Sequence, residues 1–192
     1  MHRSAFLAAL LLSLCACRSH DRSDEGRSES SSSASTGMSQ PSSAALGEGE
    51  RTFAENALRG GQFEVEASRL ALQKAASGQV RDFANMMITD HGQANRDLEN
   101  LARKKGIYPP TTLDAEHQSK LDDLRRLDGP EFDEEYRKLQ IEAHDAAIQL
   151  FERASRECRD KDLRDFASST LPKLQKHRSH LDDVSVATSA GG

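Results

Sequence analysis

Apolar residues recur every three to four positions through four long segments, and this helical period constrains the fold more than any other feature of the chain. The pattern predicts long helices over residues 52–76, 79–105, 130–158 and 160–184. Helix-breaking residues separate these segments: Ser77-Gly78 follows the first predicted helix, and Gly106 with Pro109-Pro110 ends the second. Because no period-two alternation is sustained, we expect an all-α domain at residues 51–185.

An internal repeat indicates how these helices are paired. Val80-Arg81-Asp82-Phe83-Ala84 recurs as Leu163-Arg164-Asp165-Phe166-Ala167, each time early in the second helix of a pair. A shorter amphipathic segment, residues 113–127, joins the two pairs and has a length suited to a crossover. The prediction is a ferritin-like antiparallel four-helix bundle, made of two helical hairpins and a crossover that carries a short extra helix.

Each long helix carries one polar residue in the middle of its apolar stripe. Glu64 and His91 lie about thirteen residues from the first turn, which is roughly 20 Å along each helix at 1.5 Å per residue. His144 and His177 lie at equal distances before and after the second turn, so they too are expected at the same height along the bundle. One carboxylate and three imidazoles are therefore expected in one layer near the middle of the bundle.

This set of donors predicts a site for one transition-metal ion, namely zinc, copper, iron or nickel. Asp90 and Asp145 point about 100° away from the histidines that they adjoin, so we assign them to the second shell or to solvent. His180 is a reserve ligand, available if the last helix is rotated or kinked at Pro172. His117 falls on the crossover and is expected at the surface.

A purely structural interpretation of the same layer stays open. Glu64 could pair with a protonated histidine in a buried polar layer that fixes the register of the bundle. A di-iron centre is disfavoured, because the Glu-x-x-His motifs that such centres require are missing: Ile88 precedes His91 by three positions, and Leu174 precedes His177.

These residues also resemble a bacterial family, the ferritin-like domain of unknown function 4142, whose members are often labelled exported or outer-membrane proteins. The resemblance spans residues 51–184. It implies a ferritin-like fold and no particular activity, since the function of the family is not established. The family usually carries a second Asp-His pair on the third long helix, whereas this chain reads Glu142-Ala143-His144. The motifs that carry the resemblance are Gly60-Gly61 before Glu64-Val65-Glu66, Phe83-Ala84 before Asp90-His91, Gly129 with Phe132-Asp133 and Tyr136 before His144, and Thr170-Leu171-Pro172 before His177.

The N-terminus predicts export and lipidation. His2 and Arg3 precede an apolar run at residues 5–16, which is too short to span a bilayer and has the form of a signal peptide. The run ends in Leu14-Cys15-Ala16-Cys17, which resembles a lipobox, so we expect residues 1–16 to be removed and Cys17 to carry lipid. An ordinary secretory cleavage nearby is the alternative. Arg18 favours an outer-membrane location facing the periplasm in a Gram-negative host.

The rest of the chain limits the partners that can be expected. Residues 17–50 are rich in Ser, Gly and charged residues, and we interpret them as a disordered tether, with residues 186–192 a disordered tail. Only Cys158 remains in the domain, as a small apolar filler or a reactive thiol. The formal net charge of −5, with both signs interspersed, disfavours nucleic-acid binding.

Three functions are consistent with these features. The first is a membrane-tethered periplasmic module that binds one transition metal for sequestration, sensing or stress protection. The second is a structural or interaction lipoprotein of the envelope, in which the polar layer only sets packing. The third is a metal-dependent enzyme, which we rank last because no nucleophile elbow, phosphate loop or redox Cys-x-x-Cys occurs in the sequence. Protein partners and the oligomeric state are not predicted.

Overall fold

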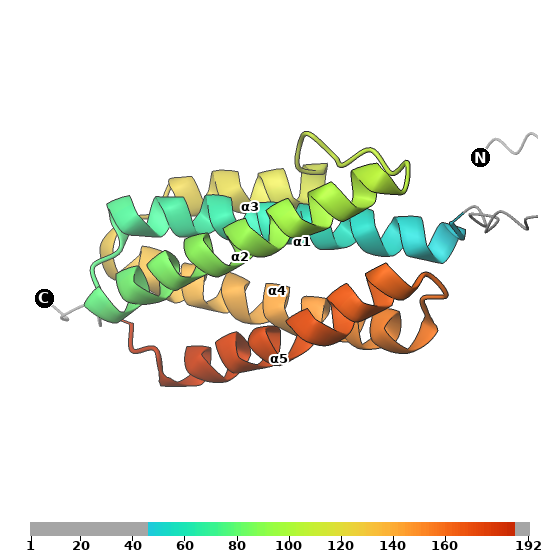
Figure 1. The fold of residues 1–192 in the computed structure, drawn as a ribbon. Helices are drawn as coiled ribbons and strands as arrows, with labels where there is room; N and C mark the ends of the chain where they lie inside the picture. The colour runs from blue at the N-terminus through green and yellow to red at the C-terminus, as the bar shows by residue number, and fades with distance from the viewer. Residues whose placement is uncertain (1–45, 187–192) are drawn as a thin grey trace, which may run out of the picture. The chain divides into compact units, whose positions relative to one another are not determined.

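The computed structural model describes residues 46–186, and it is entirely helical over that range (Figure 1). The predicted signal peptide, the predicted lipidation site at Cys17, nearly all of the predicted tether and the last residues of the predicted tail lie outside the described residues. Five helices follow one another with no strand among the described residues, namely α1 Glu48–Lys74, α2 Gly78–Lys104, α3 Ala115–Arg125, α4 Gly129–Glu157 and α5 Lys161–Asp183. The all-α prediction is therefore confirmed.

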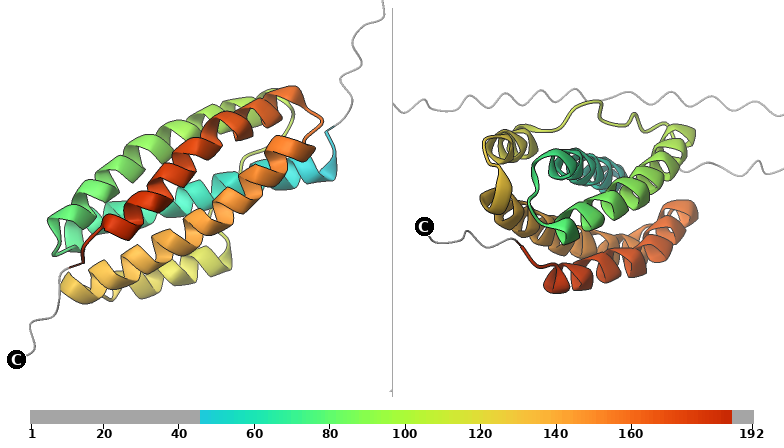
Figure 2. Two further views of the ribbon diagram at one scale, coloured as in Figure 1. Left: turned by 90° about the horizontal axis from the view of Figure 1, so that it is seen from below. Right: turned by 90° about the vertical axis from the view of Figure 1, so that its left-hand side faces the viewer.

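Two helical hairpins make up the bundle. α1 packs mainly against α2, and α4 packs mainly against α5, while α1 also contacts α4. Figure 2 shows the two hairpins lying against each other, with α3 running beside α1. None of the helices in residues 46–186 has the length and apolarity needed to cross a membrane.

The helix ends follow from local capping chemistry. Ser77 caps the N-terminus of α2, where its hydroxyl oxygen accepts a hydrogen bond from the backbone N–H of Val80. Asp160 caps α5 in the same way, because its carboxylate accepts from the backbone N–H of Leu163. Gly106 has a φ of 72°, the left-handed conformation that glycine adopts most easily, just after α2 ends. α5 continues through Pro172.

One predicted boundary was wrong. α1 begins at Glu48, four residues before the expected start, so the last residues assigned to the tether are helical. The carboxylate of Glu50 explains this, because it accepts hydrogen bonds from the backbone N–H groups of Gly47 and Asp160, each at 2.7 Å. The second of these bonds joins the start of α1 to the turn between α4 and α5, a tertiary contact that local periodicity does not encode.

The apolar core lies in two clusters, one toward each end of the bundle. Phe83, Phe132 and Tyr136 belong to the first cluster, and Phe53, Phe151 and Leu163 belong to the second. Cys158 is buried in the second cluster at the end of α4, and burial raises the pKa of its thiol. The polar side chains described next lie between these two clusters along the helices.

Candidate metal centre

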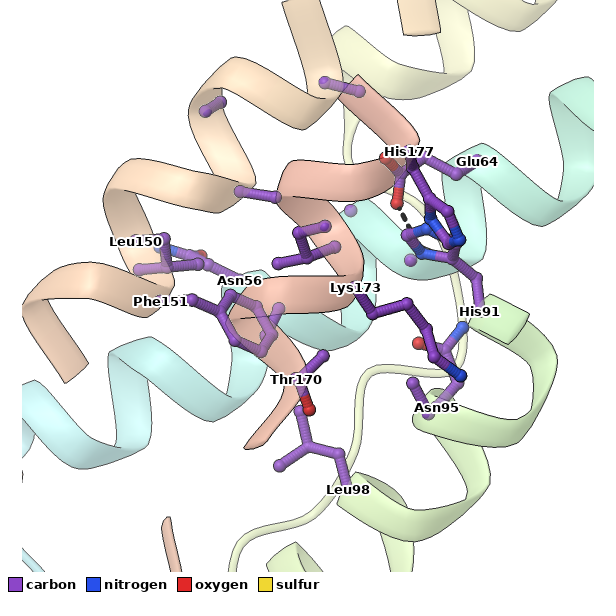
Figure 3. A pocket seen from close by; sticks show the side chains of 18 of the residues that line it. Asn56, Glu64, His91, Asn95, Leu98, Leu150, Phe151, Thr170, Lys173 and His177 are labelled. Carbon is purple, nitrogen blue, oxygen red and sulfur yellow. Dashed lines mark ion pairs between the residues drawn. The ribbon is translucent and has the colours of Figure 1, made fainter. Parts of the chain in front are cut away.

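Four side chains from four different helices meet in the middle of the bundle: Glu64 of α1, His91 of α2, His144 of α4 and His177 of α5. All four are buried, with exposed fractions between 0 and 6%. The centroids of the three imidazole rings lie 5.3, 5.4 and 5.6 Å apart. The structure thus brings together the whole set of residues that the sequence suggested as ligands, and Figure 3 shows three of the four.

Each imidazole is held through one ring nitrogen. Nδ1 of His91 lies 2.8 Å from Oε2 of Glu64, and Nδ1 of His144 lies 2.8 Å from the backbone carbonyl oxygen of Gln140. Nε2 of His177 lies 2.9 Å from Oδ2 of Asp90. A carbonyl or a carboxylate oxygen can only accept, so each of these nitrogens carries the proton.

The other nitrogen of each ring has no hydrogen-bond partner. Nε2 of His91, Nε2 of His144 and Nδ1 of His177 are all buried and unpaired among the described residues. In the neutral rings these three unpaired nitrogens carry the lone pairs, because the opposite nitrogens hold the protons. One nitrogen of each ring lies within 4.8 Å of one nitrogen of each of the other two rings. Unpaired buried nitrogens are unfavourable, so three of them on such closely spaced rings indicate a site that suits a shared electrophile.

The charge state of the layer depends on burial and on the ion pairs. Burial lowers the pKa of His144 and lowers that of His177 to about 4, so both rings are neutral at pH 7. Burial also disfavours the charged form of His91, but the nearby carboxylate of Glu64 outweighs it and raises the pKa of that ring. A metal that binds His91 therefore competes with a proton.

Glu64 is the charged centre of the layer. Burial alone would raise its pKa, but the imidazoles of His91 and His144 lower it to about 2. Oε1 of Glu64 lies 3.2 Å from Nδ1 of His144, yet the proton on that nitrogen is directed to the carbonyl of Gln140. Glu64 therefore acts on the protonated side of two rings and leaves Nε2 of His91 and Nε2 of His144 unpaired.

The remaining predicted residues lie outside this centre or support it. Asp90 holds His177 and also accepts from Nζ of Lys173 at 3.1 Å. Asp145 pairs instead with Nε of Arg178 at 2.7 Å. His180 is exposed, and its ring packs edge-on against Phe83 at 5.7 Å.

Two features of the site were missed by sequence reasoning. The carbonyl of Gln140 orients His144, and the amide of the same residue is buried without a partner for its nitrogen or oxygen. The signal available was its position one turn before His144, on the same face of the helix. His117 was expected at the surface, but it is only partly exposed, because its ring packs 5.0 Å from Phe63.

A cavity of about 290 Å³ adjoins the polar layer, and Glu64, His91 and His177 are among the residues that line it (Figure 3). His91 and His177 line it at one end, and both hairpins contribute to its wall. Small residues leave the space open: Gly60, for example, has no atom within 4 Å of the place where a Cβ would stand. The arrangement places a cavity directly beside two of the three histidines.

Two solved structures are similar to this chain. A DUF305 fragment from Deinococcus radiodurans matches with a TM-score of 0.65 and 15% identity, over 72% of this chain and 96% of that one. CopM in its Cu(I)-bound form matches with a TM-score of 0.59 and 16% identity, over 70% of this chain and 93% of that one. At these identities the likeness concerns the fold alone. No curated protein matches the chain.

A family model covers most of the sequence, including all five helices and the four central polar residues. It matches residues 35–184 and carries the description domain of unknown function (DUF4142). The chain belongs to this family.

Proposed function

We propose that this protein binds one transition-metal ion through Nε2 of His91, Nε2 of His144 and Nδ1 of His177. The observation that carries the proposal is that three buried histidines each offer a nitrogen within 4.8 Å of the others, and that each of these rings has one buried nitrogen without a hydrogen-bond partner among the described residues. Imidazole nitrogens bind zinc and copper at about 2.0–2.1 Å, so a small inward movement of the rings would bring all three into contact with one ion. Glu64, Asp90 and the carbonyl of Gln140 would fix the ring orientations.

The donor set favours copper or zinc over iron or nickel among the metals considered. Mononuclear iron sites commonly add a carboxylate to two histidines, but both nearby carboxylates here already bind protonated ring nitrogens. Three neutral imidazoles suit Cu(I), Cu(II) and Zn(II). The similar fold of CopM, which has been solved with Cu(I), supports testing copper first.

The proposed setting is the bacterial envelope. We expect Cys17 to carry a lipid that holds the domain at the outer membrane, facing the periplasm, through the tether at residues 17–50. A ferritin-like topology, with one long crossover between hairpins, is part of the same proposal. A tethered module with a single buried site would serve to sequester or sense a metal rather than to store it in bulk.

Metal content tests the proposal directly. The full chain carrying Cys17→Ser, purified without an affinity tag, would be incubated with Cu(I), Cu(II) or Zn(II), desalted and analysed for elements beside a His91→Ala/His144→Ala double variant. We expect about one ion per wild-type chain and none in the double variant. A wild type that takes up no ion at neutral pH would contradict the proposal.

A structural role for the polar layer is the second candidate, and the buried Glu64–His91 ion pair at 2.8 Å is the observation that favours it. A layer that only sets the register of the bundle can often be replaced by apolar residues without loss of stability. The structural role then predicts that a joint Glu64→Leu/His91→Leu replacement keeps or raises the free energy of unfolding, and that no metal changes the wild-type value.

A further inference from the structure

We propose that the cavity beside the three imidazoles binds a small organic carboxylate with an apolar body, which supplies the fourth ligand to the metal. This inference rests on the proposed metal site and names the class of molecule that reaches it. Three histidines leave at least one coordination position of copper or zinc open. The free nitrogens of His91 and His177 belong to side chains that line the cavity, so a bound ion would be accessible from it.

The size of the cavity fits a small organic molecule. Its volume is about 290 Å³, whereas an apolar cavity of about 150 Å³ is already large enough to bind benzene. Alanines from α2 and α4, including Ala94 and Ala147, stand where larger side chains would fill the space. The cavity therefore has room for a ring or a short aliphatic chain together with a coordinating head.

Most of the wall away from the metal is apolar. Leu98 of α2, Phe151 of α4 and Leu174 of α5 line it, and all three are buried. Figure 3 shows Leu98 and Phe151 at a distance from the imidazoles, with Lys173 nearer to them. An apolar body at that end would remain out of water, whereas a purely polar ion would gain nothing from this part of the wall.

The charges around the imidazole end favour an anionic head. Lys173 lines the cavity, and its ammonium group lies 3.1 Å from Asp90, which in turn holds His177. Among the residues that line the cavity, Glu64 and Asp90 contribute two negative charges, and Lys173 and Arg153 contribute two positive charges. A divalent ion adds two more positive charges, so the cavity with its ion carries an excess of positive charge that a carboxylate would reduce.

Benzoate tests this inference on the full chain carrying Cys17→Ser and loaded with one equivalent of Cu(II). The electron paramagnetic resonance spectrum would be followed as benzoate, and separately acetate, is added. We expect a saturable change with benzoate and an affinity for acetate that is at least tenfold weaker, because acetate lacks the apolar body. An unchanged spectrum, or equal affinities for the two acids, would overturn the inference.

Two variants that fill the cavity, Ala94→Leu and Ala147→Leu, test the location. Both retain the three histidines, so copper content should stay at that of the wild type while benzoate affinity falls at least tenfold. Ala115→Leu, on an exposed residue of α3 outside the cavity, is the matched control and should change neither quantity. Unchanged benzoate affinity in both variants would place the ligand elsewhere and contradict the inference.

The same samples separate the two proposals. A wild type that binds no copper would remove the proposed function, and this inference with it. Normal copper uptake with no benzoate response would remove only this inference and leave the metal site standing.

Discussion

The orientation of three imidazole rings decides what the polar layer can do. A histidine in a helical core can offer either nitrogen, and its choice depends on which group binds the other one. Here a carboxylate, a backbone carbonyl and a second carboxylate each hold one nitrogen, so the other nitrogen of His91, of His144 and of His177 is left to bind a ligand. Residues around the ligands therefore set the chemistry as much as the ligands do.

Replacing Glu64 by Gln should weaken metal binding without abolishing it. The amide would still contact His91 but would lose the charge that makes this imidazole more basic, and losses of about 10–100-fold in metal affinity are typical for such positions. Competition titration against a chelator measures the change. Glu66→Gln, on a more exposed residue of the same helix that pairs with Arg69, is the control and should leave the affinity unaltered. Equal affinity in Glu64→Gln and wild type would show that the carboxylate plays no part.

Sequence periodicity could predict which residues enter the layer but not which atoms face each other. The number of residues from each turn predicts that Glu64 and His91 lie at the same height, and likewise His144 and His177, because the rise per residue of an α-helix is constant. Ring orientation depends on spacings between helices that no local pattern contains. The sequence therefore predicts Glu64 as a ligand, whereas in the structure its oxygens lie beside the protonated nitrogens of His91 and His144.

Adjacent glycines in α1 show how the helices approach one another. A Cβ at Gly61 would lie 2.2 Å from Oδ1 of Asn95 on α2, while one at Gly60 would meet nothing within 4 Å. Gly61 thus permits close contact between the two helices of the first hairpin, whereas Gly60 has open space beside it, and both glycines border the cavity.

These glycines form a matched pair of variants. Gly60→Ala should raise the free energy of unfolding by about 0.5–1 kcal/mol, because alanine loses less backbone entropy in a helix. Gly61→Ala should raise the free energy of unfolding by less than Gly60→Ala does, because the side chain of Asn95 must move away from the new Cβ. Urea unfolding of both variants at pH 7 measures the difference. Equal stabilisation by the two substitutions would contradict the packing described here.

Glu50 joins the start of α1 to the turn before α5, and this contact predicts a pH dependence. Burial tends to raise the pKa of this carboxyl, but the N–H groups of Asp160 and Gly47 hold it below its ordinary value of 4.5. A group with a lowered pKa in the folded state stabilises the fold above its unfolded pKa, and the contribution disappears as pH falls through the folded value.

Glu50→Gln should therefore lower the midpoint of urea unfolding at pH 7, and its difference from the wild type should shrink toward pH 3. Glu48→Gln changes an exposed glutamate in the same helical turn and serves as the control. A deficit in Glu50→Gln that is as large at pH 3 as at pH 7 would mean that the carboxylate charge is not responsible.

Most helix boundaries could be predicted because their signals are local. Ser77, Asp160, Gly106 and the apolar stripes placed α2, α4 and α5 within one residue of the structure at each end. The start of α1 could not be predicted, since it depends on the distant turn that Glu50 contacts. α3 also covers a second side of α1 and buries Phe63 against His117, a contact between helices that the spacing of apolar residues along α1 does not encode.

At the scale of the whole molecule, the proposed metal site ties the two hairpins together. His91 belongs to the first hairpin, and His144 and His177 belong to the second. An ion bound by all three stabilises the folded state by mass action, since the unfolded chain does not hold the three nitrogens together.

A bound metal should therefore raise the free energy of unfolding by about 2.7 kcal/mol when its free concentration is 100 times the dissociation constant. Urea unfolding with and without metal measures this gain, and a chelator should reverse it. His144→Ala should show no gain at the same concentration. A gain of the same size in that variant would indicate binding at the surface instead.

The most direct test of the account is the coordination shell itself. X-ray absorption spectroscopy of the metal-loaded protein at neutral pH reports the number and type of ligand atoms. The proposed site predicts three imidazole nitrogens at about 2.0–2.1 Å, with the imidazole scattering lost in the His91→Ala/His144→Ala variant. A shell made of oxygen or sulfur atoms, or one that persists in that variant, would contradict binding by the three histidines.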